Sequence, residues 1–188
     1  MTAAEISIRH DLRPGDLGAI IAHHGATYLP EYGLDSTFEA HVGAGVAEAG
    51  KRGFPGPNER LWIVEAGRRH AGSLALTDEG EGVGAVRWFV LDRALRGEGL
   101  GRRLLDELVG EARAGGYEDL YLETFGDLRA AAHLYRSHGF ELVSEQAGPR
   151  WGRERLAYQR YELSLQARAQ SSSWTSTGSS SRPFSVSA

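Results

Sequence analysis

The stretch LRGEGLGRRLL, residues 95–105, decides how the rest of this sequence is interpreted. Glycine stands at every second position, at Gly97, Gly99 and Gly101, and the leucines that follow have helical spacing. Glycine disfavours a helix because it has the most backbone freedom to lose, so three glycines in an opening turn cost stability. The stretch therefore predicts a helix start at which a ligand must approach bare backbone.

A glycine-rich turn between a strand and a helix is typical of an anion-binding site. The first N–H groups of a helix lack partners, and the helix dipole places partial positive charge there. Arg96 and Arg102 flank the turn and have the fork geometry that binds two phosphate oxygens at once. The plainer alternative is a tight connection with surface arginines, but one glycine would satisfy such a turn. We therefore expect a phosphate-bearing ligand.

Two common nucleotide motifs do not fit this loop. A dinucleotide fingerprint requires G-x-G-x-x-G, yet Leu104 or Arg102 stands at the third position, depending on whether the motif begins at Gly99 or Gly97. Asp119 has the spacing of a ribose-binding acid, but without the glycine pattern that spacing carries no weight. A P-loop requires Gly-Lys-Ser/Thr, which the sequence lacks.

The composition indicates one soluble domain. The chain has 188 residues, 41% of them hydrophobic, and a net charge of -4, which gives no overall attraction to nucleic acid or to an anionic membrane. We expect the folded domain at residues 1–168 and a disordered serine-rich tail at 169–188. Neither a signal core nor a membrane-length apolar run is found in the sequence, so a cytoplasmic protein is expected.

The reactive side chains are limited by the absence of cysteine, which excludes disulfides, thiolate metal ligands and a cysteine nucleophile. Seven histidines are present, but adjacent His23 and His24 cannot easily chelate one ion from a helix, and His133 and His138 are five residues apart. We therefore expect no metal site, and histidines and carboxylates as the candidates for acid-base chemistry.

The apolar pattern predicts a mixed α/β sheet in the order β-α-α-β-β-β-α-β-α-β-β. Because strands lie on both sides of helical segments, only the crossovers through a helix should pair in parallel. Asp127 has the side chain of an N-cap for the last helix. The expected strands are 6–10, 61–66, 70–77, 83–91, 119–125, 140–145 and 160–166, and the expected helices are 16–25, 36–49, 100–114 and 128–138.

The segment 86–140 resembles the GCN5-related N-acetyltransferase (GNAT) superfamily. It contains Arg-x-x-Gly-x-Gly from Arg96 to Gly101 and, further on, AAAHLYRSHGF at residues 130–140. In that family the first motif binds the pyrophosphate of coenzyme A, and the second is a last helix that runs into a strand. Segments 89–105 and 150–166 are most similar to the acetyltransferase half of bacterial proteins that join a MarR-type DNA-binding domain to a GNAT domain, although no DNA-binding half is recognised here.

The resemblance implies a GNAT fold, a mixed six- to seven-stranded sheet with splayed central strands and flanking helices. It implies acetyl-CoA as co-substrate and an acetyl group moved to a primary amine by direct attack in a ternary complex. It implies cofactor contacts from Phe89, Leu91, Arg96, Gly97, Glu98, Gly99, Leu100, Gly101 and Arg102. Many members have an asparagine early in the last helix that contacts the cofactor, but Leu128 stands at that position here.

Two proton-transfer roles follow from the same resemblance. Tyr135 matches the tyrosine that often protonates the departing thiolate, although a half-buried core tyrosine is the simpler interpretation of an amphipathic helix face. Family members use different groups as the general base. Glu123 is the first candidate and Glu65 the second, and a solvated strand carboxylate is the alternative for each.

The acceptor is expected between segment 26–42 and segment 145–156. The candidates for orienting an amine are Tyr28, Glu31, Tyr32, His41 and Trp151, while the acids Glu31 and Asp35 would suit a cationic acceptor. The acceptor is expected to be a small-molecule or peptide amine, with neither nucleic acid nor membrane as a partner, and the resemblance allows a homodimer. A GNAT-fold module that binds acyl-CoA without catalysis is the alternative function.

Overall fold

The computed structural model describes residues 5–166 of the chain. The predicted serine-rich tail and its boundary at residue 168 lie outside the described residues. The elements follow in the predicted order, with one added 3-10 turn, η1. They are β1 (Ile6–Arg9), α1 (Asp16–Tyr32), α2 (Ser36–Lys51), β2 (Arg60–Ala66), β3 (Arg69–Asp78), β4 (Val83–Leu91), η1 (Arg93–Leu95), α3 (Leu100–Ala114), β5 (Asp119–Phe125), α4 (Arg129–Ser137), β6 (Glu141–Arg150) and β7 (Arg153–Ser164).

One seven-stranded mixed sheet organises the chain, in the order β1-β2-β3-β4-β5-β7-β6. Its one parallel pair among the described strands is β4 with β5, which are joined by the crossover through α3. All other neighbouring strands are antiparallel. Three of these pairs, β2–β3, β3–β4 and β6–β7, are consecutive in the chain and form hairpins. The prediction of a mixed sheet of up to seven strands is confirmed.

The parallel pair separates along its length. The register joins β4 to β5 only from Val83 to Ala85 on one strand and from Asp119 to Tyr121 on the other. Beyond these positions no register pair connects the two strands within the described part of the chain. The sheet is therefore splayed at its centre, which leaves the backbone of residues 86–91 without a strand partner on the β5 side.

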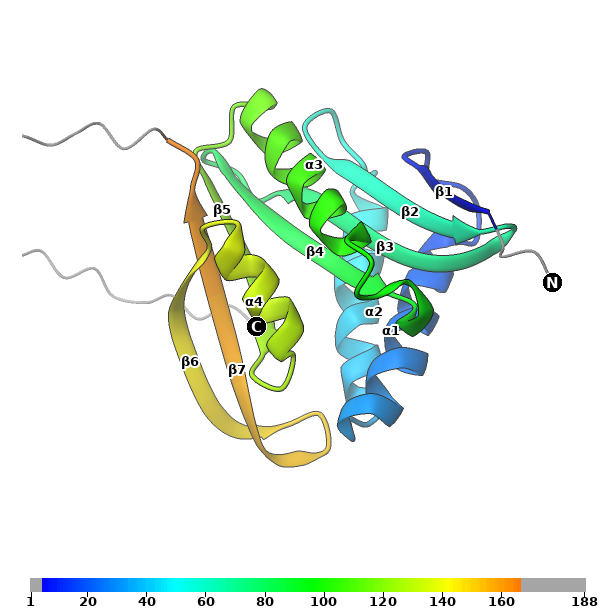
Figure 1. Ribbon diagram of the computed structural model, residues 1–188, viewed down its shortest axis with the longest axis vertical. Helices are drawn as coiled ribbons and strands as arrows, with labels where there is room; N and C mark the ends of the chain where they lie inside the picture. Colours follow the sequence, from blue (N-terminus) through cyan, green and yellow to red (C-terminus); the bar gives the residue numbers. More distant parts are fainter. Residues whose placement is uncertain (1–4, 167–188) are drawn as a thin grey trace, which may run out of the picture.

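Helices cover both faces of the sheet, α3 and α4 on one face and α1 and α2 on the other (Figure 1). Each pair encloses its own core. Leu104 and Leu108 of α3 are fully buried with Tyr161 and Leu120 on the first face. On the second face Ile20, Phe38, Val42 and Val46 pack with Leu61, Ile63 and Phe125. The splay between β4 and β5 is thus the place where the two faces of the sheet are connected.

Helix α1 is longer than predicted, since it continues through Gly25 to Tyr32. A Cβ atom on Gly25 would come within 2.8 Å of the Glu39 carboxyl carbon, so this glycine allows α1 and α2 to approach closely and does not end the helix. Helix α4 begins later than predicted, at Arg129 with Leu128 as its N-cap residue. The prediction of Asp127 as N-cap is therefore wrong, and its carboxylate pairs with Arg153 instead.

The segment predicted as the acceptor loop, 145–156, is mostly a β-hairpin. Strands β6 and β7 pair with each other up to the tight turn at Trp151 and Gly152. Both turn residues have positive φ. Gly148 and Pro149 resemble strand breakers, but β6 is an edge strand and the register shifts between Gly148 and Arg150. A proline is tolerated at such a bulge because no ladder hydrogen bond is lost.

Candidate active site

The glycine loop has the open backbone that the sequence predicted. Gly97 and Gly99 have φ values of 86° and 85°, in the left-handed region that favours glycine. Gly99 is the N-cap residue of α3, and the Arg103 N–H donates to its carbonyl at 3.0 Å. No described atom lies within 4 Å of the Cβ positions of Gly97 and Gly99. The loop therefore leaves room for a phosphate group at the positive end of α3.

A groove of about 450 Å³, the predicted cofactor groove, runs from this loop along β4 and α4. Seven of the nine predicted cofactor residues line it: Phe89, Leu91, Arg96, Gly97, Gly99, Gly101 and Arg102. The other two do not. Glu98 is exposed, and the half-buried side chain of Leu100 packs against the core of the α3–α4 face.

Arg96 is held at two points beside the loop. Its Nε donates to the Leu91 carbonyl at 3.0 Å, which joins the end of β4 to the turn that follows. Its Nη1 lies 2.7 Å from Glu31 Oε2 at the end of α1. The guanidinium therefore joins the end of β4 to the loop and is paired with a carboxylate from α1.

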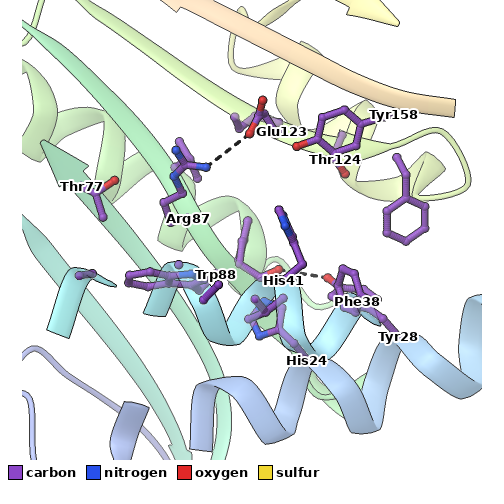
Figure 2. A pocket seen from close by; sticks show the side chains of 18 of the residues that line it. His24, Tyr28, Phe38, His41, Thr77, Arg87, Trp88, Glu123, Thr124 and Tyr158 are labelled. Atoms are coloured by element: carbon purple, nitrogen blue, oxygen red, sulfur yellow. Dashed lines mark hydrogen bonds and ion pairs between the residues drawn. The ribbon is translucent and has the colours of Figure 1, made fainter. Parts of the chain in front are cut away.

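A second cavity, also of about 450 Å³, lies on the α1–α2 face and is the predicted acceptor cavity. Its wall combines rings with charged side chains from α2, β4, β5 and the turn after β3 (Figure 2). Four residues line both this cavity and the groove: Tyr28, Phe89, Leu128 and Tyr135. The two spaces therefore meet through the splay of the sheet, and a group bound on one face can reach a group bound on the other.

Tyr135 lies at this junction and is 6% exposed. Its ring contacts Phe140 and Tyr161, with centroid distances of 6.2 and 6.0 Å. Burial raises the pKa of the phenol above its usual range, so the hydroxyl keeps its proton at neutral pH. The residue is thus a buried core tyrosine whose neutral phenol lines both spaces.

The backbone of β4 is kinked at the junction. Trp88 has φ of 49°, and neither Trp88 nor Phe89 has a partner in the register with β3. The Ser73 hydroxyl donates to the Trp88 carbonyl at 2.7 Å, which fixes the bulge. From the opposite side, the Tyr28 hydroxyl donates to the Phe89 carbonyl at 3.1 Å. The Phe89 backbone therefore lies outside both ladders, at the edge of the splay.

Glu123 lies on the acceptor side of the sheet, where Figure 2 shows it facing Arg87. Arg87 Nη1 is 3.5 Å from Glu123 Oε2. Burial, together with the nearby negative charge of Glu123, raises the pKa of the Tyr158 phenol. The second candidate base, Glu65, is not part of this cavity. Its Oε1 accepts from Arg9 Nε at 2.9 Å beside the edge strand β1, so the structure does not bring it to the cavity that Glu123 lines.

The structure divides the predicted acceptor residues. His41 and Trp151 line the acceptor cavity, and Tyr28 lines both spaces. Tyr32 lines the cofactor groove, and Glu31 is bound to Arg96. Asp35 caps α2 by accepting from the Thr37 N–H at 2.9 Å, so neither predicted acid lines the acceptor cavity.

The charged residues that line the acceptor cavity are mostly ones that the sequence did not indicate. The cavity is lined by Glu48, Arg52, Glu79 and Arg87, none of which the sequence singled out. Helical spacing from His41 would have found Glu48, which lies two turns further along α2. Nothing local in the sequence indicates Arg87, because its position at the cavity depends on the splay of β4 from β5.

His24 is buried in the cavity wall, 4% exposed. Its Nδ1 lies 2.8 Å from the Ile20 carbonyl, and burial lowers its pKa to about 4.

Across residues 5–166 no group of three or more potential metal ligands is found. None of the helices in that range is long and apolar enough to cross a membrane.

Comparison with known proteins agrees with this arrangement. A family model described as "Acetyltransferase (GNAT) family" matches residues 18–140, which include the glycine loop, the splay and Tyr135. The chain belongs to the GNAT family. Its fold is also that of an acetyltransferase of the GNAT family from Staphylococcus aureus Mu50, with a TM-score of 0.68 at 16% identity, covering 86% of this chain and 100% of that one. The structure of yncA from Salmonella typhimurium with its cofactor acetyl-CoA has a TM-score of 0.63 at 20% identity, covering 91% of this chain and 100% of that one.

Two curated relatives match shorter segments of this GNAT chain. N-alpha-acetyltransferase RimI of Mycobacterium tuberculosis is 51% identical over 58 residues, which are 31% of this chain and 35% of that protein. IAA acetyltransferase of Azospirillum brasilense is 41% identical over 69 residues, 37% of this chain and 44% of that protein. The matches thus span less than half of each of these relatives.

Proposed function

We propose that this chain transfers an acetyl group from acetyl-CoA to a primary amine by direct attack in a ternary complex. The observation that carries the proposal is the meeting of two cavities at Tyr28, Phe89, Leu128 and Tyr135. A donor on the α3–α4 face and an amine on the α1–α2 face would meet there through the splayed sheet. Direct transfer also suits a chain without cysteine.

The cofactor groove fits coenzyme A. Backbone N–H groups at the start of α3, together with Arg102, would bind the pyrophosphate, where the glycines leave open space. Phe89 and Leu91 would hold the extended arm of the cofactor along the unpaired side of β4. When bound, acetyl-CoA supplies an activated thioester carbonyl. The yncA structure, which holds acetyl-CoA on the same fold, supports this assignment.

Three groups of the chain would stabilise charge or transfer protons at the junction. The Phe89 N–H, outside both ladders, would stabilise negative charge that develops on the carbonyl oxygen. Glu123, which faces Arg87, would accept a proton from the incoming amine. Tyr135, kept neutral by burial, would donate a proton to the leaving thiolate.

We further propose a cytoplasmic enzyme that acts on a small-molecule or peptide amine and binds neither nucleic acid nor membrane. The names of the two curated relatives, both acetyltransferases, support the reaction class. A similarity to the acetyltransferase half of MarR–GNAT fusions and a homodimer remain predictions from the resemblance.

A thiol-release assay tests the proposal. The chain is mixed with acetyl-CoA and separate amines, including polyamines, aminoglycosides, amino acids and lysine peptides, and free coenzyme A is measured. Amine-dependent release is expected with at least one class. Acetyl-CoA that stabilises the fold without any amine-dependent release would instead support a non-catalytic acyl-CoA-binding module.

A further inference from the structure

Two consecutive side chains of β4 lie on the same face of the sheet. Val86 is buried in the core of the α3–α4 face, and Arg87 lines the acceptor cavity on the other face. Regular alternation along a strand would return Trp88 to the α3–α4 face. Its ring instead packs against the core of the α1–α2 face, and Figure 2 shows it on the acceptor cavity together with Arg87. The side-chain alternation of β4 therefore shifts by one residue at Trp88.

The bulge in β4 causes this shift. At the register shift between Ser73 and Ala75, one residue of β3 faces two residues of β4. Trp88 is one of the two, and its φ of 49° is a left-handed conformation that is unusual for a bulky side chain. Bulges next to active sites often redirect a side chain, and strained backbone is retained mainly where it serves a function. The strain at Trp88 therefore accompanies the placement of its ring in the acceptor cavity.

The ring of Trp88 is less enclosed than those of the other described tryptophans. Trp62 is buried, and its Nε1 donates to Glu107 at 3.1 Å. Trp151 also lines the acceptor cavity, but it is 9% exposed. Its ring is surrounded by the rings of Phe38, His41, Phe125 and Tyr158 and by the Arg150 guanidinium. Trp88 is half-buried and within residues 5–166 has one ring neighbour, Phe54, at a centroid distance of 5.3 Å. Its ring therefore keeps a surface that a bound molecule can contact.

The indole N–H of Trp88 lies beside α2. Its Nε1 is 3.9 Å from the position that a Cβ on Gly45 would occupy. Gly45 and Ala49 both line the cavity, so this part of the α2 wall consists of small residues that leave space beside the N–H. Glu48 of the same helix does not use the N–H, since its carboxylate is 73% exposed and lies 3.6 Å from Lys51. Within the described chain the Trp88 N–H has no hydrogen-bond partner and is not buried, so a ligand in the cavity can reach it.

We infer that Trp88 is an acceptor-binding residue and that its N–H binds an oxygen atom of the amine substrate. An indole N–H is only a donor, so it binds a hydroxyl, carbonyl or carboxylate oxygen and disfavours an ammonium group. The face of the ring contacts the carbon skeleton beside that oxygen. The substrate class is therefore an amine that also carries oxygen, such as an amino alcohol, an amino sugar or an amino acid derivative. The inference rests on the proposed transfer reaction and names the substrate class of the same site.

Trp88→Phe tests the N–H, because phenylalanine keeps an aromatic ring at this position and has no donor. The thiol-release assay is run with the best oxygen-bearing amine of the screen. The KM for this amine should rise about three- to tenfold, the effect expected from one lost hydrogen bond. Both kcat and the Kd of acetyl-CoA should stay close to wild type, since the N–H contacts neither the cofactor groove nor the reacting atoms. An amine KM that stays at its wild-type value overturns the inference.

Trp62→Phe is the matched control, because it makes the same chemical change away from the cavity. Trp62 lines neither the acceptor cavity nor the cofactor groove, and its N–H is bound to Glu107. This variant should melt at a lower temperature, since it alters a buried side chain, while the amine KM stays at the wild-type value. An amine KM that rises equally in Trp62→Phe and Trp88→Phe would reflect a general loosening of the fold, which contradicts the inference.

Analogues of the same amine test the oxygen. Each oxygen of the best amine is replaced in turn by a methylene or methyl group, and kcat/KM is measured with the wild type and with Trp88→Phe. One analogue should be poorer than the parent amine by about three- to tenfold in the wild type and nearly equal to it in the variant. If every analogue loses as much in Trp88→Phe as in the wild type, the N–H binds no oxygen of the substrate and the inference is overturned.

The remaining outcomes distinguish this inference from the proposed function. Amine-dependent release of coenzyme A only with amines that lack oxygen, such as polyamines, overturns the inference and leaves acetyl transfer standing. The same holds for a substrate whose KM is unaffected by Trp88→Phe. An absence of amine-dependent release with every amine of the screen overturns both the proposed function and the inference.

Discussion

Glu31 Oε2 lies 2.7 Å from Arg96 Nη1, so the last turn of α1 is bound to the arginine that precedes the glycine loop. The two side chains are 25% and 34% exposed. The same helix reaches the cofactor strand through the Tyr28 hydroxyl, which donates to the Phe89 carbonyl at 3.1 Å. One helix thus contacts the cofactor site at two points while it forms a wall of the acceptor cavity.

The Glu31–Arg96 pair predicts a change in cofactor affinity. Glu31→Gln removes a negative charge beside the expected pyrophosphate, while the bond from Arg96 Nε to the Leu91 carbonyl still holds the arginine in place. Calorimetric titration should show coenzyme A binding several-fold tighter, since the partly exposed pair is worth about 1 kcal/mol at most. Pantetheine, which lacks the pyrophosphate, should bind both proteins equally. Weaker coenzyme A binding in the variant would mean that Glu31 is needed to position Arg96.

Two glycines of the loop should differ in how their substitution acts. Gly101 has ordinary φ, and a Cβ there would meet its nearest side-chain atom, on Leu134, at 3.6 Å, so Gly101→Val should fold while its branches fill the groove. Gly99 has φ of 85°, so Gly99→Ala should cost about 1 kcal/mol of stability from backbone strain. Melting curves with and without acetyl-CoA distinguish the two effects.

In those curves the wild type should gain about 2.7 kcal/mol at a hundredfold excess of ligand over Kd. Gly101→Val should keep its melting temperature without ligand and lose the ligand-induced gain. An undiminished gain in Gly101→Val would place the cofactor elsewhere.

The glycine loop and the order of elements were predictable because their signals are local. Helical leucine spacing after residue 100 and the breaker Gly115 fix α3 without reference to the rest of the fold. The position of Tyr135 on the last helix, α4, followed from a motif within that helix. These features depend on a few neighbouring residues, so one sequence suffices.

The acceptor side depends on contacts between distant segments and was predicted less well. Glu65 and Glu123 look alike as strand carboxylates, but β2 lies beside the edge strand β1, where Arg9 binds Glu65. Glu123 faces the cavity because β5 lies at the splay. Strand order decides between them, and the sequence carries no local signal for it.

Buried histidine predicts acid sensitivity of the fold. His24 has an ordinary pKa of 6.5 when unfolded, and burial lowers it to about 4 in the folded chain. Between these values the unfolded state binds the proton and the folded state does not, so stability is lost as the pH falls from 6.5 to 4. The loss should approach about 1.4 kcal/mol per pH unit for this group.

Urea unfolding at several pH values measures that slope. His24→Gln should show a shallower dependence between pH 6.5 and 4 than the wild type. His133→Gln, at an exposed position of α4, serves as the control and should keep the wild-type slope. Parallel curves for His24→Gln and the wild type would show that His24 is already protonated in the fold.

The most direct measurement for the account as a whole is single-turnover acetyl transfer by Tyr135→Phe, with the best amine from the thiol-release screen. Phenylalanine keeps the ring that packs on Phe140 and Tyr161 and removes only the proton that the phenol can donate. We predict a rate lower by about 10²–10⁴-fold, with acetyl-CoA affinity and melting temperature close to wild type. A wild-type rate in Tyr135→Phe would contradict the assignment of the junction as the reaction centre with Tyr135 as its acid.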